Sequence, residues 1–193
     1  MNSNLITFEE GHVHSTYSDG SHSLSEIFAY NQTHDQLNLN ITDHVDKNTT
    51  WFSTYVAEIK KLRKKYPDFS VAIGCEVKIL EDGTVNTTQE ILDACEVVIG
   101  SVHHFEGYNV LASEEFMKKE YELTKLLASN TQIDILGHAF SMCMRVYKGK
   151  VQPPREWVEE IYQLCIKNKI KLEFNAKHAP QALRELAREE IAD

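Results

Sequence analysis

Two histidines one residue apart, His12 and His14, are the first residues of this chain whose spacing points to chemistry. They stand at the end of an apolar opening run, and the segment Ser15-Thr16-Tyr17-Ser18-Asp19-Gly20 follows directly. Because alternate side chains of a strand point to the same side, both imidazoles can reach one metal ion, with Asp19 a turn further on. This spacing predicts a metal site at the end of the first strand.

Further side chains that can bind metal recur along the chain, each at the end of its own short apolar run. They are Asp43, His44, Glu76, His103, His104 and His138. Imidazoles and carboxylates suit Zn²⁺, Mn²⁺ or Fe, and a carboxylate can bridge two neighbouring ions. Two such ions would lower the pKa of a shared water enough to give hydroxide near neutral pH, and would stabilise charge on a phosphoryl group. The donor set therefore indicates a hydrolase.

The segments between these side chains read as strands alternating with helices. Ser23 and Glu26 form a capping box that starts the first predicted helix. Apolar runs predict later strands at 37–41, 70–75, 97–102, 133–137 and 170–175, and helical spacing predicts helices between them and at 181–192. No linker, low-complexity tract or strong repeat interrupts residues 1–193, which predicts a single domain.

Strands alternating with helices predict a parallel sheet and an α/β fold. An open doubly wound sheet would place its ligand at one switch point, fed by only a few strands. Here polar groups follow one strand after another, which indicates a closed or nearly closed barrel with its site at the carboxyl ends of the strands. We therefore predict a distorted β/α (TIM-like) barrel.

Composition narrows the class of protein. The chain has 193 residues, of which 42% are hydrophobic, as is ordinary for a globular domain. A net charge of −9 argues against broad nucleic-acid binding, which depends on neutralising phosphates. The opening residues do not resemble a signal peptide, and no run approaches the roughly 18 apolar residues of a membrane span, so we expect a cytoplasmic protein. The four cysteines lack a CxxC pair and are expected to be reduced thiols.

The motifs HxHSTYSDG, TDH, GCEVKIL, GSVHH and LGHAF, in this order, resemble those of the polymerase and histidinol phosphatase (PHP) superfamily. The resemblance covers nearly the whole chain, and the motifs are specific in combination, although any one alone would be weak. It implies a metal-dependent phosphoesterase on a distorted seven-stranded β/α barrel. The run from Gly74 to Gly83, and its spacing to Gly100-Ser101-Val102-His103, resemble the small phosphatases and the barrel appended to some bacterial family X DNA polymerases more than the dedicated histidinol phosphatases.

The resemblance also implies two or three divalent metal ions (Zn, Mn or Fe) and a role for each ligand. The implied ligands are His12 and His14 for a first ion, Glu76 as a bridge, His103 and His138 for a second ion, and Asp19 and His44 for a third. A metal-bridging hydroxide would be the nucleophile, with no separate protein acid or base. Arg145 is a candidate contact for a substrate phosphate, because guanidinium matches phosphate geometry, and an exposed loop arginine is the alternative.

One family motif is missing from this sequence. The family pattern closes with an Asp-x-His pair on a last strand, and the chain contains no such pair. The strand predicted at 170–175 resembles the penultimate strand, so we expect a barrel that lacks its last strand. C-terminal truncation is favoured over a natural variant with weakened first and third sites, because a barrel without its closing strand has two open edges.

These features predict a phosphatase that removes phosphate from a phosphate monoester of a small metabolite or nucleotide. Two alternatives remain open. One is an exonuclease-like activity on nucleic acid ends, which the acidic net charge disfavours. The other is a degenerate barrel that binds metal or a ligand without turnover. A small phosphorylated substrate is the expected partner, with no membrane partner, and the sequence indicates neither which metal binds nor the oligomeric state.

Overall fold

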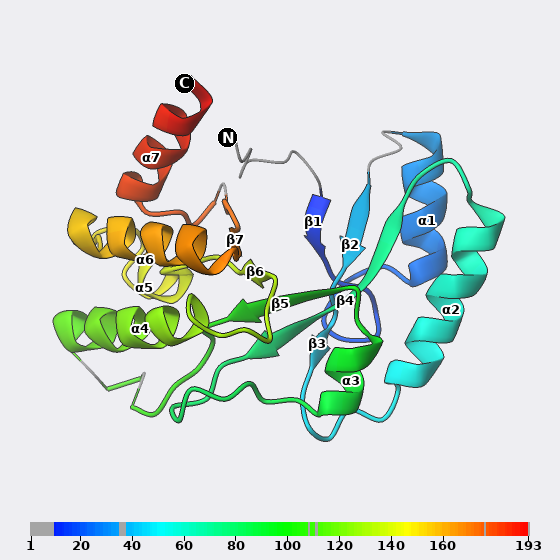
Figure 1. Ribbon diagram of the computed structural model, residues 1–193, viewed down its shortest axis with the longest axis horizontal. Helices are drawn as coiled ribbons and strands as arrows, with labels where there is room; N and C mark the ends of the chain where they lie inside the picture. Colours follow the sequence, from blue (N-terminus) through cyan, green and yellow to red (C-terminus); the bar gives the residue numbers. More distant parts are fainter. Residues whose placement is uncertain (1–9, 35–37, 108, 111, 176, 193) are drawn as a thin grey trace. The chain divides into compact units, whose positions relative to one another are not determined.

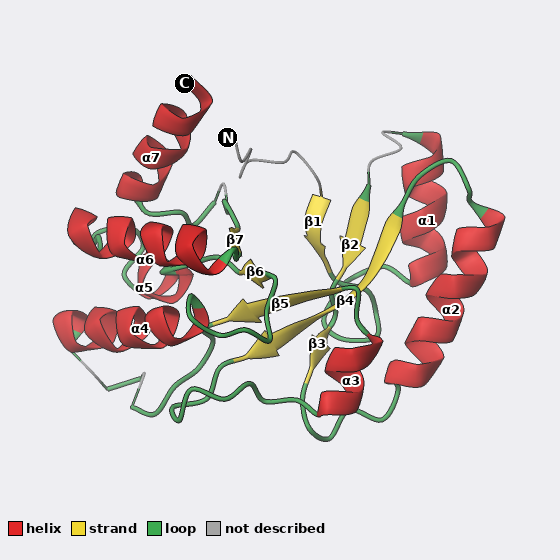
Figure 2. Ribbon diagram, viewed as in Figure 1, coloured by secondary structure: helices red, strands yellow, loops and turns green. Residues whose placement is uncertain are grey.

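The computed structural model describes residues 10–34, 38–107, 109–110, 112–175 and 177–192. Strands and helices alternate along the chain (Figures 1 and 2), and the pairings of β1 with β2, β2 with β4, β3 with β4 and β6 with β7 are all parallel. The predicted α/β class is therefore confirmed. Among the described residues, 10–77 and 86–99 form one compact unit, the N-terminal unit, and 78–85 with 100–192 form another, the C-terminal unit.

The N-terminal unit is built on a parallel sheet. Its strands are β1 (Glu10–Val13), β2 (Leu39–Ile41), β3 (His44–Val45), most of β4 (Val71–Lys78) and the start of β5 (Val97–Ser101). They pair in the order β1-β2-β4-β5, with β3 beside β4. The register sets His44 opposite Glu76, so two of the predicted metal ligands become direct neighbours across strands.

Three helices belong to this unit: α1 (Leu24–Thr33), α2 (Phe52–Lys65) and α3 (Gln89–Ala94). The capping box at Ser23 and Glu26 starts α1, as predicted. α2 buries an apolar stripe at helical spacing, which includes Tyr55 and Ile59. The hydroxyl of Tyr55 donates to the carbonyl oxygens of Ile41 (2.6 Å) and Gly74 (3.1 Å). This helix is therefore tied to β2 and β4 just before the residues that carry the chemistry.

The C-terminal unit combines two short strands with four helices. They are β6 (Ile135–Leu136), β7 (Lys171–Leu172), α4 (Ser113–Leu127), α5 (Ser141–Val146), α6 (Arg155–Asn168) and α7 (Gln181–Ala192). The helix α6 contacts both α4 and α7. An added Cβ at Gly100, at the end of β5, would lie 2.7–2.9 Å from the side chains of Leu127 and Ile133, so only glycine allows this close approach.

The structure corrects several predicted boundaries. The strand predicted to end at Cys75 continues to Lys78, because β3 pairs with Glu76 and Val77 and extends it. Neither β3 nor α5 was predicted, since a two-residue strand shows no periodicity and a loop was expected after His138. The strands predicted at 133–137 and 170–175 have only two residues each. Leu37 of the strand predicted at 37–41 lies outside the described residues.

Two expectations about the whole chain can be compared with the described residues. Cys75, Cys95, Cys143 and Cys165 are all free thiols, as expected. None of the helices in the described ranges is long and apolar enough to cross a membrane.

Candidate metal centre

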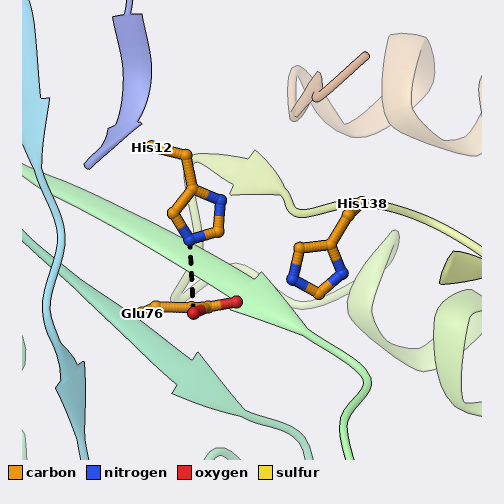
Figure 3. A group of neighbouring side chains, drawn as sticks. All are labelled: His12, Glu76 and His138. Carbon is orange, nitrogen blue, oxygen red and sulfur yellow. Dashed lines mark ion pairs between the residues drawn. The ribbon is translucent and has the colours of Figure 1, made fainter. Parts of the chain in front are cut away.

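The carboxylate of Glu76 is the meeting point of three imidazoles in the N-terminal unit. Its side chain is only 1% exposed, and its Oε2 lies 3.2 Å from His12 Nε2, 3.3 Å from His14 Nε2 and 2.9 Å from His44 Nδ1. Figure 3 shows the His12 ring directed at this carboxylate. An ionised carboxylate is costly to bury without a cationic or hydrogen-bonding partner, so the surrounding imidazoles are essential to its position.

His12 and His14 converge as their spacing predicts. His12 lies in β1 and His14 follows one residue after the strand ends, so both rings are directed to the same side. Their Nε2 atoms are 3.0 Å apart, and the ring centroids are 4.9 Å apart. Two imidazole nitrogens directed at one point, beside a carboxylate oxygen, are the arrangement that a divalent metal ion requires.

Asp19 contacts His14 and His44 at the nitrogens that do not face Glu76. Its Oδ1 lies 2.6 Å from His14 Nδ1, and its Oδ2 lies 3.6 Å from His44 Nε2. A carboxylate at the outer nitrogen of an imidazole fixes the tautomer whose other nitrogen can bind metal. Asp19 is 68% exposed, in contrast to the buried Glu76.

These contacts change the proton affinity of His14. Burial lowers its pKa, but hydrogen bonds to Glu76 and Asp19 outweigh this effect, so the pKa of His14 is above its ordinary value. The same hydrogen bond to His14 lowers the pKa of Asp19. The group of side chains around Glu76 therefore favours positive charge, as a cation site must.

The donor atoms fit a divalent cation. His14, His44 and Glu76 each offer one ligand atom, and these atoms all lie within 4.8 Å of one another. Imidazole nitrogens with a carboxylate oxygen are typical ligands of Zn²⁺, Mn²⁺ and Fe. The structure thus brings together five of the predicted site residues, which are His12, His14, Asp19, His44 and Glu76.

The two remaining histidines of the predicted ligand set lie together in the C-terminal unit. His103 follows β5 and His138 follows β6, and their ring centroids are 5.5 Å apart. Ser141 Oγ lies 2.9 Å from His138 Nδ1, which leaves Nε2 as the nitrogen suited to a metal ion. The backbone N–H of His138 donates to Glu173 (3.1 Å). His104, which was also counted among the side chains that can bind metal, is exposed.

Comparison with known proteins agrees with this geometry. The family model for the PHP domain matches residues 10–177. This chain belongs to the PHP domain family. It is also similar to a DNA polymerase/3'-5' exonuclease PolX of Bacillus subtilis (strain 168), with 27% identity over 183 residues. That alignment covers 90% of this chain and 30% of the length of the relative. PHP domains bind divalent metals and are generally hydrolases, so their metal sites are the relevant comparison for the cluster around Glu76.

The sequence analysis counted Asp43 among the side chains that can bind metal, but its carboxylate is directed at Ser15 and Ser18 and not at the imidazoles around Glu76. Its carboxylate is fully buried and accepts hydrogen bonds from Ser15 and Ser18. The only feature of the sequence that could have pointed to this supporting role is that Asp43 directly precedes the predicted ligand His44.

Arg145 lies on α5 and is exposed, not on a loop as predicted. Its Nη2 lies 3.1 Å from the sulfur of Met142. The neighbouring carboxylate of Glu120 was missed by sequence reasoning. Glu120 is 1% exposed and accepts the backbone N–H groups of Met142 (2.9 Å) and Cys143 (2.7 Å) at the start of α5. Burial raises its pKa to about 7.

Proposed function

We propose that this PHP domain is a metal-dependent phosphatase that hydrolyses a phosphate monoester of a small metabolite or nucleotide. The observation that carries the proposal is the convergence of three imidazoles on the buried carboxylate of Glu76. Membership of a family of metal-dependent phosphoesterases supports the reaction class. We also propose that the parallel strands belong to a distorted seven-stranded β/α barrel, as the resemblance implies.

The proposed metal ligands are those that the resemblance implies. They are His12, His14, Asp19, His44, Glu76, His103 and His138. When bound, two or three Zn, Mn or Fe ions would supply an activated water and positive charge for the phosphoryl oxygens. The choice among these metals depends on availability as much as on ligand type.

The side chains themselves have three tasks in this mechanism. Glu76 supplies a buried negative charge that offsets the charge of the cations. Asp19 holds Nδ1 of His14, so that the Nε2 lone pair is directed towards Glu76 and the metal position. Arg145 is proposed to bind a phosphate oxygen of the substrate, since its exposed guanidinium has the geometry for paired hydrogen bonds.

A second candidate is 3'-5' exonuclease activity on nucleic acid ends. It is supported by the similarity to PolX, whose printed name includes that activity. The net charge of −9 disfavours it, because this chain would have to attract phosphates without an overall positive charge. A third candidate is metal or ligand binding without turnover.

One experiment separates the three candidates. The purified chain is loaded in turn with Mn²⁺, Zn²⁺ and Fe²⁺ and is assayed on p-nitrophenyl phosphate, on a panel of sugar phosphates and mononucleotides, and on end-labelled oligonucleotides. Phosphate release from the monoesters, lost in His12→Ala, would support the phosphatase. Stepwise shortening of the oligonucleotides without monoester hydrolysis would support the exonuclease. Tight metal binding with no turnover on any substrate would contradict both enzymatic proposals.

A further inference from the structure

We infer that Asp43 is a positioning residue of the metal centre, which holds Ser15 and Ser18 so that Asp19 is kept against His14 and His44. The inference rests on the proposed function in one respect, because it takes these imidazoles to be metal ligands. Asp43 itself is not one of the proposed metal ligands. Its effect is exerted through the loop that carries Asp19.

The carboxylate of Asp43 accepts four hydrogen bonds from Ser15 and Ser18. Its side chain has no exposed surface. Oδ1 accepts from the Ser15 N–H (3.0 Å), the Ser18 N–H (3.0 Å) and the Ser18 hydroxyl (2.7 Å), and Oδ2 accepts from the Ser15 hydroxyl (2.8 Å). Hydrogen bonds to a charged acceptor are stronger than neutral ones. One carboxylate therefore holds two residues that are three positions apart on the loop.

Asp19 lies between two anchored residues, Ser18 and Gly20. Ser18 is held by Asp43, and the Gly20 N–H donates to the Ser15 carbonyl oxygen (3.0 Å). Asp19 itself is 68% exposed, so packing contributes little to its placement. Its carboxylate nevertheless lies 2.6 Å from His14 Nδ1. The backbone on either side of Asp19 must therefore determine this contact.

The segment Thr42-Asp43 is itself fixed to the strands that carry the other ligands. The Glu76 N–H donates to the Asp43 carbonyl oxygen (3.1 Å), and the N–H of the preceding Thr42 donates to the Val13 carbonyl oxygen (2.7 Å). His44 follows in the chain. Asp43 is thus joined to β4 through its own backbone, to β1 through the backbone of Thr42, and to Ser15 and Ser18 through its side chain. This is the connectivity that a residue needs to position one ligand relative to the others.

A purely structural role makes a different prediction. If Asp43 only stabilised the fold, its replacement would weaken metal binding by the same factor whether or not Asp19 were present. If it acts through Asp19, replacement of Asp43 costs affinity in the wild type but costs none once Asp19 has been removed. A double-mutant cycle measures this difference directly.

The experiment is Mn²⁺ binding by isothermal titration calorimetry to the full chain and to Asp43→Asn, Asp19→Ala and the double variant. The amide turns one accepting atom into a donor and removes the charge, so Asp43→Asn should weaken Mn²⁺ binding by about tenfold or more, in the range of other outer-shell changes. The double variant should bind no more weakly than Asp19→Ala. Asp46→Asn is the matched control, because the Asp46 carboxylate accepts from the Asn48 N–H (2.7 Å) and not from Ser15 or Ser18. The Mn²⁺ affinity of this variant should equal that of the wild type.

A milder variant covers the case in which Asp43→Asn fails to fold. Ser18→Ala removes one of the four hydrogen bonds and should weaken Mn²⁺ binding less, again only when Asp19 is present. Unaltered affinity in Asp43→Asn, or equal losses in both backgrounds, would overturn the positioning role and leave the metal site standing. Absence of Mn²⁺ binding by the wild type would overturn both the proposed function and this inference.

Discussion

The Oε2 atom of Glu76 lies 3.2 Å from Nε2 of His12, and the Glu76 side chain is 1% exposed. An ionised carboxylate in such a position requires compensating positive charge or hydrogen bonds. A divalent cation meets this requirement when it is bound, and in its absence a proton on His14, whose pKa is raised, contributes to it. Metal binding and protonation should therefore compete at this centre.

Replacement of Glu76 by glutamine should nearly abolish metal binding. Glutamine keeps the size of the side chain but removes the charge on which the three imidazoles converge. Loss of an outer-shell partner already costs ~10–100-fold in affinity, so loss of a direct ligand should cost at least ~100-fold. Calorimetric titration with Mn²⁺ measures the change. Glu90→Gln on the exposed face of α3 is the control, and a Glu76→Gln variant that binds Mn²⁺ as well as Glu90→Gln would contradict the site.

The metal affinity should fall with acidification, starting above pH 6.5. Burial lowers the pKa of His14, but hydrogen bonds to Glu76 and Asp19 raise it above 6.5 overall. Since a metal ion needs the neutral imidazole, protons compete with it over the range up to the raised pKa. In the metal-free protein, acidification instead increases the contribution of His14 to the stability of the fold. The protonated His14 contributes stability that is fully present below pH 6.5 and is lost as pH rises through the folded-state pKa.

Asp19→Asn tests this assignment. It removes one of the two hydrogen-bonding carboxylates, so the pKa of His14 should fall and the loss of Mn²⁺ affinity should begin at a lower pH. Histidine titration by NMR in the metal-free protein gives the pKa directly. Asp46→Asn should leave the titration of His14 as in the wild type. An unchanged pKa in Asp19→Asn would mean that the 2.6 Å contact between Asp19 and His14 does not persist in solution.

Much of the fold followed from periodicity in the sequence. The helices α1, α2, α4, α6 and α7 were predicted because each is at least ten residues long and carries either a clear cap or an apolar stripe. β3 was not predicted, because two residues are too few to show a period. α5 lies where a loop was expected after His138, whereas the equally short α3 was predicted. The extension of β4 past Cys75 depends on pairing with β3, which is a tertiary contact that the local sequence does not encode.

The structure brings several predicted site residues together, but the side chains that support them were not predicted. His12 and His14 were predicted to converge from strand alternation alone, and they do. The role of Asp43 could not be read in this way, because a carboxylate that binds backbone N–H groups looks the same in sequence as one that binds metal. Glu120 did leave a signal. It occupies the buried face of α4 together with Phe116 and Leu123, where helical spacing calls for an apolar residue.

Gly20 should not tolerate a side chain. A Cβ at this position would clash with the His14 carbonyl oxygen and would lie 2.7 Å from the Ser15 nitrogen. These backbone atoms cannot move without displacing His14 and the segment that carries Asp19. Gly20→Ala should lower the free energy of unfolding by about 1–3 kcal/mol, as overpacking does, and should weaken Mn²⁺ binding. Urea unfolding and calorimetry measure the two effects. The exposed neighbour offers a control, Ser21→Ala, and equal behaviour of the two variants would exclude a tight turn at Gly20.

Glu120 should make the domain less stable as pH rises towards neutrality, whereas a salt-bridged acid makes a protein less stable as pH falls. Burial raises its pKa to about 7, although hydrogen bonds from Cys143 and Met142 lower it. Between the ordinary value of 4.5 and about 7 the folded state therefore holds a proton that the unfolded state has lost. The stability that this provides is complete below pH 4.5 and is lost as pH rises through 7, a change of about 3 kcal/mol.

Glu120→Gln should remove this pH dependence, because the amide does not ionise. The variant should be less stable than the wild type at pH 5, where glutamine leaves one of the two N–H groups of Met142 and Cys143 without an acceptor oxygen. The difference should shrink or reverse by pH 8, where the wild type has to bury a charge. Urea unfolding across this range measures it. Glu122→Gln, on the exposed side of the same helix, should keep the wild-type profile, and the same profile in Glu120→Gln would show that Glu120 is ionised in the folded protein throughout.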